Sequence, residues 1–262
     1  QAEKPDMVLV YGDTNSTLAG AVNAAKLHIP VAHVEAGLRS FDRTMPEEVN
    51  RIVSDHLSAL LFAPTRDAVK NLAQEGISAG VHWVGDVMFD STLLMIEIAK
   101  KTSRIVEDLG LTPGQFAVAT LHRQSTTDEP GALQEAVGFL KENAEGLKVV
   151  LPLHPRTRAA AERLGVSLEG ITVLDPVGPV DMHALLAASA SVFTDSGGVQ
   201  KEAYFHQKPC ITLRDTTEWT ETVQAGWNRL WKGPDFIQPR RTIPDYGTGH
   251  ASDDIAAVLA AA

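Results

Sequence analysis

Short apolar runs alternate with longer amphipathic stretches along the whole chain. The runs are continuous in Val, Ile, Leu, Phe and Ala, which is typical of strands buried on both faces of a parallel sheet. We expect strands at 7–11, 30–34, 60–63, 82–84, 116–120, 149–153, 171–174, 191–194 and 209–213. Helical patterns occupy 16–27, 47–56, 66–75, 91–109, 132–143, 157–164, 181–188, 200–206, 218–225 and 252–260. This alternation predicts an α/β fold.

A break in the helical pattern divides the chain. Gly110-Leu111-Thr112-Pro113-Gly114 ends the long helix and predicts a domain boundary there. We place an amino-terminal lobe with its linker helix at 1–109, a second lobe at 110–250, and a terminal helix at 251–262 that packs back on the first lobe. With 262 residues, 44% of them hydrophobic, the chain is long enough for two α/β cores.

Composition narrows the classes of function. A net charge of −10 argues against non-specific nucleic-acid binding, so local Arg, His and backbone N–H groups would have to meet an anionic ligand. The only cysteine, Cys210, excludes an intramolecular disulfide, favours a reducing, cytoplasmic location, and is most simply a small core residue. Because no apolar run approaches the ~20 residues that span a bilayer, we expect no membrane partner.

One strand-to-helix turn has the pattern of an anion site. The expected strand 191–194 stops at a turn in which Ser196 can cap the next helix, and Gly197 and Gly198 allow a phosphate to approach its first N–H groups. Glu202 follows about one turn later, where a carboxylate can accept hydrogen bonds from two ribose hydroxyls. Taken alone, Ser-Gly-Gly fits a plain tight turn equally well.

Acidic side chains follow the first two strands and open a helix. Asp13 and Glu35 each come just after an expected strand, and Glu47 lies in the first turn of a helix that Pro46 opens. Each has a structural alternative: Asp13 as a helix cap, Glu35 in a salt bridge to Arg39, and Glu47 as a solvated charge at the helix dipole. We expect all three carboxylates to lie at the ligand-binding end of the parallel sheet.

Basic side chains are placed in the same way. Arg39 follows the second strand, and Arg51 shares a helix face with Glu47, four residues earlier. In the second lobe, His122 and His154 each follow a strand, which points to one cleft beside the Ser-Gly-Gly turn. Neither histidine has a metal-ligand spacing, so we expect no metal.

Seven motifs together resemble the non-hydrolysing UDP-N-acetylglucosamine 2-epimerases. They occur in the order of that family and span nearly all of the chain, at 12–14, 34–39, 46–51, 122–123, 154–155, 196–202 and 213–218. Trp219 and the segments 221–223 and 225–230 look more like the branch that acts on UDP-diacetamido uronic acids. The chain departs from the family pattern at two places. Lys201 stands where a second Glu is frequent, and the run that begins at Gln124 replaces a Glu-Asn pair. These departures bear on sugar preference and on allosteric activation by substrate.

The resemblance implies a fold and a reaction. The fold would be the GT-B arrangement of two Rossmann-like lobes with the active site in the cleft between them. The reaction would invert C2 of a UDP-2-acetamido sugar by eliminating UDP to give a glycal and adding UDP back on the other face. No nicotinamide or other cofactor is implied, in agreement with the lack of a Gly-x-Gly-x-x-Gly fingerprint. The family also implies a homodimer that supplies precursors for surface polysaccharide.

The resemblance assigns roles by position. Asp13, Glu35 and Glu47 would share the acid and base work as a coupled set, with His122 counted among the catalytic residues. His122 and Arg51 would also hold the substrate and its phosphates. Ser196, Gly197 and Gly198 would cradle the diphosphate, and Glu202 would contact the ribose. Arg39 and His154 would line the cleft.

Several readings stay open. The first strand resembles one well inside the family's amino-terminal lobe, so we expect about two βα units, on the order of 70 residues, to be missing from it. Those units would include a Gly-Arg loop that contacts the nucleotide. The alternatives are a UDP-diacetamido-uronate 2-epimerase, a GT-B glycosyltransferase, a hydrolysing epimerase, and a truncated nucleotide-sugar binder without turnover. The exact sugar and the division of acid and base roles are not determined by the residues.

Overall fold

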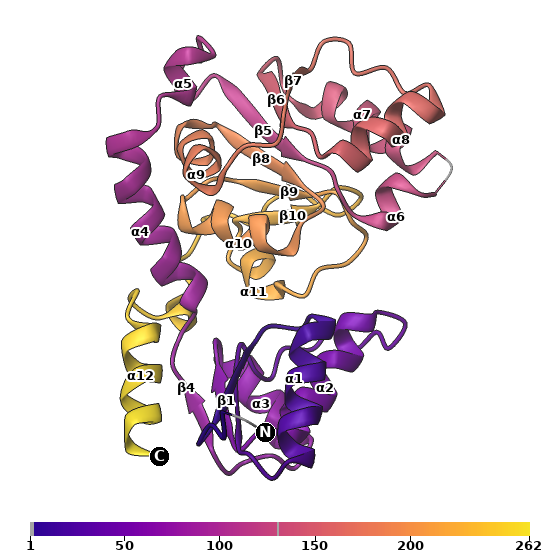
Figure 1. The fold of residues 1–262 in the computed structure, drawn as a ribbon. Helices are drawn as coiled ribbons and strands as arrows, with labels where there is room; N and C mark the ends of the chain where they lie inside the picture. Colours follow the sequence, from indigo (N-terminus) through magenta and orange to yellow (C-terminus); the bar gives the residue numbers. More distant parts are fainter. Residues whose placement is uncertain (1–2, 130) are drawn as a thin grey trace. The chain divides into compact units, whose positions relative to one another are not determined.

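A computed structural model of the chain describes residues 3–129 and 131–262. The chain forms two compact units, Gln1–Asp90 with Pro244–Ala262, and Ser91–Ile243. The boundary between the units lies near the start of helix α4 (Val87–Thr102), whereas the sequence placed the lobe boundary after this helix (Figure 1).

The first unit contains a four-stranded parallel sheet in the order β1-β2-β3-β4. Its strands are β1 (Val8–Tyr11), β2 (Val31–Val34), β3 (Leu60–Ala63) and β4 (Val81–Trp83). The helices of this unit are α1 (Asn15–Lys26), α2 (Pro46–Leu57), α3 (Arg66–Gln74) and α12 (Ala251–Ala261). Consecutive strands are neighbours, so the loops after β1 and β2 lie side by side at one edge of the sheet.

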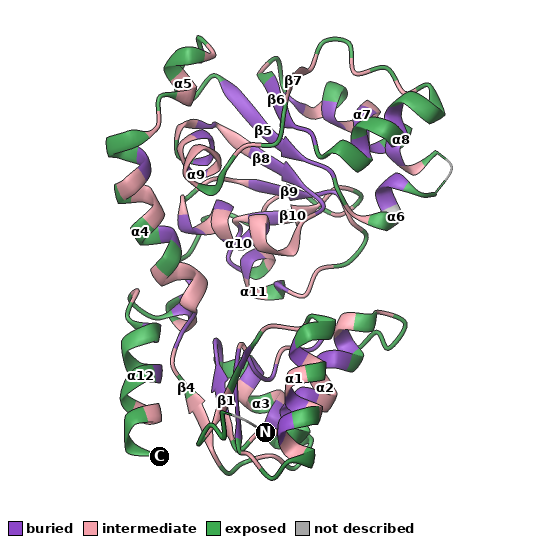
Figure 2. Cartoon of the chain, in the orientation of Figure 1, coloured by how far each residue is buried: buried purple, intermediate pink, exposed green. Residues whose placement is uncertain are grey.

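The two faces of this sheet bury different helices. Val31 belongs to a cluster that includes Ala21 and Ala24 of α1, whereas Ile255 of α12 packs in a cluster with Ala32 and other residues of β2 and β3. Figure 2 shows that α12 is exposed over most of its length and buried at few positions. Successive residues of a strand point to opposite faces, which explains why neighbours in β2 meet different helices. His33 therefore points to the same face as Val31, toward α1 and α2.

The second unit contains a six-stranded parallel sheet in the order β10-β9-β8-β5-β6-β7. Its strands are β5 (Phe116–Thr120), β6 (Lys148–Pro152), β7 (Thr172–Leu174), β8 (Ser191–Thr194), β9 (Cys210–Thr212) and β10 (Asn228–Leu230). Its further helices are α5 (Ile105–Asp108), α6 (Gln124–Thr127), α7 (Ala132–Asn143), α8 (Pro155–Leu164), α9 (Pro179–Ala188), α10 (Gly197–Phe205) and α11 (Thr220–Gln224).

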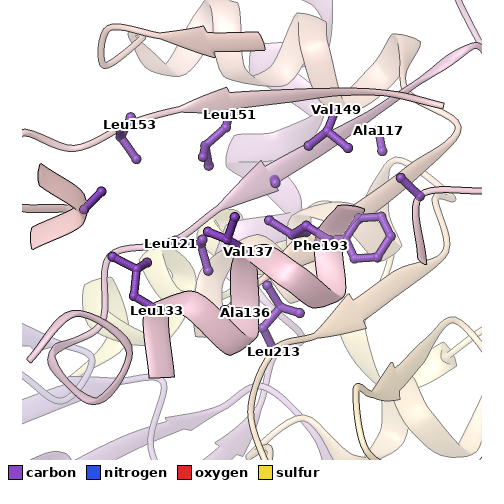
Figure 3. Packing of buried hydrophobic residues seen from close by; sticks show 14 of the residues in the cluster. Ala117, Leu121, Leu133, Ala136, Val137, Val149, Leu151, Leu153, Phe193 and Leu213 are labelled. Carbon is purple, nitrogen blue, oxygen red and sulfur yellow. The ribbon is translucent and has the colours of Figure 1, made fainter. Parts of the chain in front are cut away.

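Two apolar cores cover the two faces of this sheet. Alternate residues of β5 enter different cores: Ala117 and Ala119 join the cluster with α7 and α8, and Phe116 and Val118 join the cluster with α9 and α10. Figure 3 shows the first of these, where Leu133, Ala136 and Val137 of α7 pack against side chains of the strands. Burial on both faces is why these strands read as continuous apolar runs.

The structure confirms the nine predicted strands within a residue or so at each end and adds β10. The single helix predicted at 91–109 is wrong. It breaks between α4 and α5, where the hydroxyl of Ser103 donates to Oδ1 of Asp181 at 2.6 Å. The segment 234–249 holds one short 3-10 helix, η1 (Pro244–Tyr246). Within the described ranges, none of the helices combines the length and the apolar character that a membrane span requires.

Candidate functional site

In the second unit, the order of the strands itself marks a ligand site. From β5 the chain continues to β6 and β7 on one side, whereas β8 leads to β9 and β10 on the other. Ligands of such doubly wound sheets bind where the strand order reverses, outside the carboxyl ends of the strands. The residues that directly follow β5 and β8 are Leu121-His122-Arg123 and Asp195-Ser196-Gly197.

The turn after β8 presents unused backbone donors. Ser196 caps α10 as predicted, its Oγ accepting from the N–H of Val199 at 3.4 Å. In the described parts of the chain, no hydrogen bond occupies the N–H groups of Gly197 and Gly198. These amides and the helix dipole together favour an anion at this point. A side chain at Gly197 would require Glu218 to move, because its Cβ would lie 2.5 Å from Oε1 of Glu218.

Glu202 lies further along α10 and is mostly buried. Its carboxylate has no hydrogen bond or ion pair to any other described residue. Burial raises the pKa of Glu202, and the nearby Lys201 opposes this only in part. A buried carboxylate without donors is expected to gain most from a ligand that supplies them, such as a pair of hydroxyl groups.

A cavity of about 210 Å³ adjoins the same strand ends. This volume is below the ~300–1,000 Å³ that holds a whole drug-sized ligand, so it suits one part of a larger molecule, such as a planar base. The cavity is lined by Thr120, Leu121, His122, Pro152, His154, Pro176, Val177, Met182 and Val199. His154 also caps α8, because its Nδ1 accepts from the N–H of Arg156 at 3.3 Å.

Asp195 orders the loop that carries His122. Its carboxylate is fully buried, accepts from the N–H groups of His122 (2.9 Å) and Arg123 (3.0 Å), and lies 3.2 Å from Nδ1 of His122. Burial alone would raise the pKa of Asp195, but these hydrogen bonds outweigh it and hold the pKa below its usual range. Asp195 was not among the predicted site residues, although its place at a strand end is the signal used for the others.

A third carboxylate, Glu218, lies between two arginines. Its oxygens are 3.0 Å from Nη2 of Arg214 and 4.0 Å from Nη2 of Arg123. Burial works to raise the pKa of Glu218, but Arg214 outweighs it and the pKa is lowered. The resemblance had marked Arg214 and Glu218 only as part of a motif; the structure brings Glu218, paired with Arg214, to Gly197 at the start of α10.

In the first unit, the structure brings Asp13 and Glu35 to neighbouring strand ends. Oε2 of Glu35 lies 3.5 Å from the point that a Cβ of Gly12 would occupy, and Gly12 directly precedes Asp13. Thr14, not Asp13, caps α1, its side chain accepting from the N–H of Thr17 at 3.3 Å, so the capping alternative for Asp13 is wrong. Glu35 has a φ of 74°, in the left-handed region that non-glycine residues rarely adopt.

The amino-terminal half of α2 supplies the other charged groups. Arg51, with 3% of its side chain exposed, lies 3.6 Å from Asp13 and 3.7 Å from Glu48. Glu48 accepts from the N–H groups of Ser40 and Phe41 at 2.8 and 3.0 Å, so it secures the preceding loop. The sequence had paired Arg51 with Glu47 on one helix face, but Glu48 is the acidic partner on α2 within ion-pair distance.

Arg39 has a different setting from the one expected. Its guanidinium lies 2.8 Å from Oδ2 of Asp55 and 2.7 Å from Oε1 of Glu75, with only 1% of the side chain exposed. Burial disfavours the charged form, but Glu75 and Asp55 outweigh it and raise the pKa of Arg39. Because both carboxylates of this network already occupy the guanidinium, the geometry favours a structural role for Arg39. A role in substrate binding stays a prediction.

Asn50 was not predicted as a site residue. Its Nδ2 donates to the backbone oxygen of Asp13 at 2.9 Å and to Oδ1 of Asn15 at 3.0 Å, so α2 holds the loop after β1. The signal was present, because Asn50 stands in the run from Pro46 to Arg51 that carries the resemblance. Within the described residues, no group of three or more His, Cys, Asp or Glu side chains has the geometry of a metal site.

A family model described as UDP-N-acetylglucosamine 2-epimerase matches residues 1–260. The chain belongs to this family. The UDP-2,3-diacetamido-2,3-dideoxy-D-glucuronate 2-epimerase of Pseudomonas aeruginosa is 51% identical over 98% of this chain and 75% of its own length. The UDP-N-acetylglucosamine 2-epimerase of Methanocaldococcus jannaschii is 43% identical over 87% of this chain and 65% of its own length.

Solved structures of the family match the fold. The M. jannaschii enzyme in complex with UDP-GlcNAc and UDP matches with a TM-score of 0.90 and 38% identity, over all of this chain and 77% of that one. The predicted family, the α/β class with Rossmann-like lobes and the isomerase class are confirmed. The chain spans three quarters of the P. aeruginosa relative and just under two thirds of the M. jannaschii one in sequence.

Proposed function

We propose that the protein is a non-hydrolysing 2-epimerase of UDP-2-acetamido sugars. What supports it most directly is the pair of carboxylates, Asp13 and Glu35, at the ends of neighbouring parallel strands in a chain of this family. Its relatives include 2-epimerases of UDP-N-acetylglucosamine and of UDP-2,3-diacetamido-2,3-dideoxy-D-glucuronate. The homodimer, the cytoplasmic location and the supply of polysaccharide precursors are proposed from family membership alone.

The hydrogen at C2 of such a sugar is only weakly acidic, so direct removal would be slow. Elimination avoids a free carbanion at C2, because UDP leaves as the proton is removed. A base takes the C2 proton, the C–H electrons form the C1=C2 bond, and the C1–O bond breaks with its electrons leaving on UDP. Re-addition of the diphosphate oxygen to C1, with proton delivery to the other face of C2, gives the epimer. No net oxidation occurs.

Each group then has a role in this sequence. We assign the proton transfers at C2 to the carboxylate set of Asp13, Glu35 and Glu47, without dividing acid from base. Arg51 supplies positive charge beside Asp13 for the departing diphosphate or the sugar oxygens. In the second unit, His122 and Arg123 would donate hydrogen bonds to the diphosphate.

The second unit would hold the nucleotide. The amides of Gly197 and Gly198 bind the diphosphate, Glu202 accepts from the ribose hydroxyls, and the cavity beside His154 takes the uracil. A mostly buried carboxylate, unused donors and a small cavity at one strand-order reversal support this division.

A single experiment tests the proposal. The protein is incubated in D2O with UDP-N-acetylglucosamine and, separately, with the diacetamido uronate, and C2 deuterium and free UDP are followed by NMR. We expect deuterium at C2 and a manno-configured UDP-sugar. A glycosyltransferase would show no C2 exchange, a hydrolase would release free sugar with each UDP, and a non-catalytic binder would bind UDP with neither change.

The diacetamido uronate is the second candidate substrate. The higher identity to the P. aeruginosa epimerase, 51% against 43%, favours it. Its additional acetamido group and carboxylate call for polar partners that N-acetylglucosamine does not need. Comparison of kcat/KM for the two UDP-sugars decides between them.

A further inference from the structure

His33 is enclosed in the first unit and makes two hydrogen bonds. Its side chain is fully buried, its Nδ1 lies 2.7 Å from Oδ1 of Asp55, and its Nε2 lies 2.8 Å from the carbonyl oxygen of Gly12. A carbonyl oxygen only accepts hydrogen bonds, so Nε2 of His33 must carry a hydrogen. The state of Nδ1 then depends on Asp55.

The carboxylate of Asp55 is surrounded by donors. Its Oδ2 accepts from the N–H of Gly37 at 3.1 Å and lies 2.8 Å from the guanidinium of Arg39. A carboxylate with such partners is ionised and acts only as an acceptor, so Nδ1 of His33 also carries a hydrogen. His33 is therefore an imidazolium. Two cations, His33 and Arg39, balance two anions, Asp55 and Glu75, which is the condition under which buried charges are tolerated.

The hydrogen bond from His33 to Gly12 fixes the Gly12–Asp13 peptide. Gly12 has a φ of 63°, donates its N–H to the carbonyl of Val34 at 3.0 Å, and presents its own carbonyl to His33. With both ends of Gly12 held, the Gly12–Asp13 peptide has one orientation. Asn50 holds the next carbonyl, that of Asp13, from α2.

The same network reaches the segment after Glu35. Asp55 accepts from the N–H of Gly37, and Arg39 donates to the carbonyl of Leu38 at 2.7 Å. Glu35 itself places a carboxylate oxygen beside Gly12. One buried charge network thus holds both strand-end loops that carry the two carboxylates.

We propose that doubly protonated His33 is a positioning residue for the reaction, which sets the orientation of Asp13 through the carbonyl of Gly12. The inference rests on the proposed epimerase function, because it assigns Asp13 to the chemistry. His33 itself does not touch the substrate. Removal of its bond to Gly12 lowers kcat with little change in KM, because the binding groups of the second unit are untouched.

Two matched substitutions separate positioning from stability. In His33→Gln the amide nitrogen takes the place of Nε2 and keeps the bond to Gly12. In His33→Asn it takes the place of Nδ1 and keeps the bond to Asp55. Both remove the charge, so we expect similar losses of stability in urea. We expect His33→Asn to lose about 10–100-fold in kcat and His33→Gln to lose clearly less, as for a misplaced catalytic group. Equal kcat in the two variants overturns the proposal.

A second measurement does not depend on activity. In protein labelled with ¹⁵N-histidine, the His33 ring, assigned by its loss in His33→Asn, should show hydrogen on both nitrogens. Hydrogen on only one overturns the assigned charge state. If the wild type turns over no UDP-sugar, the proposed function fails, and crystal structures of the two variants still test the positioning. A shift of Asp13 in His33→Asn but not in His33→Gln supports it, and no shift in either overturns it.

Discussion

Nη2 of Arg51 lies 3.6 Å from Oδ2 of Asp13, which is too long for a hydrogen bond although close enough for strong attraction. The guanidinium is almost fully buried, while the side chain of Asp13 is 40% exposed. Nε of Arg51 also has no hydrogen-bond partner in the described residues, and Glu48 lies 3.7 Å away. A buried guanidinium with unfilled donors, next to an exposed carboxylate, is suited to gain an oxygen of a ligand.

The first prediction concerns Arg51→Lys. The ammonium keeps the charge but loses the planar donor fork that can serve Asp13, Glu48 and a substrate oxygen together. We expect a loss of about 1–2 kcal/mol in the free energy of unfolding, because Asp13 remains partly solvated, and a KM raised by about tenfold. Urea denaturation and steady-state kinetics measure both. Arg104→Lys, at an exposed surface pair, is the control and should change neither.

The second prediction concerns the backbone of Glu35. A non-glycine residue at a φ of 74° carries strain of about 1 kcal/mol, which glycine relieves. We expect Glu35→Gly to be as stable as the wild type or slightly more stable, with epimerisation lost and UDP affinity kept. Calorimetry, C2 deuterium exchange and UDP titration give these three results.

Glu145 provides a matched control for the strain. It is exposed and has a φ of 52°. Glu145→Gly should gain similar stability and keep full turnover. Glu35→Gln should lose turnover at unchanged backbone strain. If Glu35→Gly keeps its turnover, Glu35 takes no part in the chemistry.

The third prediction uses the raised pKa of Glu202. Because burial disfavours its ionised form, the wild type without ligand is most stable below the usual carboxyl pKa and loses that part of its stability as pH rises through the raised value. Glu202→Gln lacks this titration. We expect the variant without ligand to be more stable than the wild type at pH 7, with the difference fading below about pH 4.5.

The effect of Glu202→Gln on UDP affinity should be opposite to its effect on stability. Glu202→Gln loses affinity for UDP because the ribose hydroxyls lose a charged acceptor. The loss should be much smaller for 2′-deoxy-UDP, which has only one of the two hydroxyls. Calorimetric titrations of both nucleotides with both proteins form the test. An equal loss for the two nucleotides would place Glu202 away from the ribose.

The fourth prediction concerns Asp195→Asn. The pKa of Asp195 is lowered in the folded protein, so its contribution to stability is complete above the unfolded value and is lost as pH falls through the folded one. We expect the variant to lose about 1–3 kcal/mol at pH 7 and less at a pH below the usual aspartate pKa of about 4. Urea midpoints across this range measure the difference. A loss that is the same at both values would show that the ionised carboxylate is not responsible.

The sequence predicts the strands well because burial on both faces makes them continuous apolar runs. Strand β10 escapes this signal. Its first residue, Asn228, is buried through polar bonds, accepting from Thr212 at 2.9 Å and donating to Gln200 at 3.1 Å. Such bonds depend on residues from other strands and helices, and a local pattern does not contain them.

The candidate site was also predicted only in part from the sequence. Strand ends predict that Asp13 and Glu35 lie close together in the first unit and that His122 lies at a strand end of the second, because parallel strands of one sheet present their carboxyl ends at one edge. The partners of each charge are set by tertiary contacts. Arg39 finds Asp55 and Glu75 instead of Glu35, although Glu35 is much closer in sequence. Sequence separation therefore gives poor guidance to buried ion pairs.

The fifth prediction uses Cys210 as a reporter of the second unit. Burial raises the pKa of this thiol to about 12, so at pH 8 it is both protonated and shielded. We expect almost no reaction with a disulfide reagent in the native protein and rapid reaction of one thiol in urea. UDP should slow the native reaction in proportion to one plus its concentration divided by its Kd, since only the folded unit binds it. Glu35→Gln should keep this protection, whereas Glu202→Gln should need more UDP to reach it. A native reaction that UDP does not slow would remove the nucleotide site from the second unit.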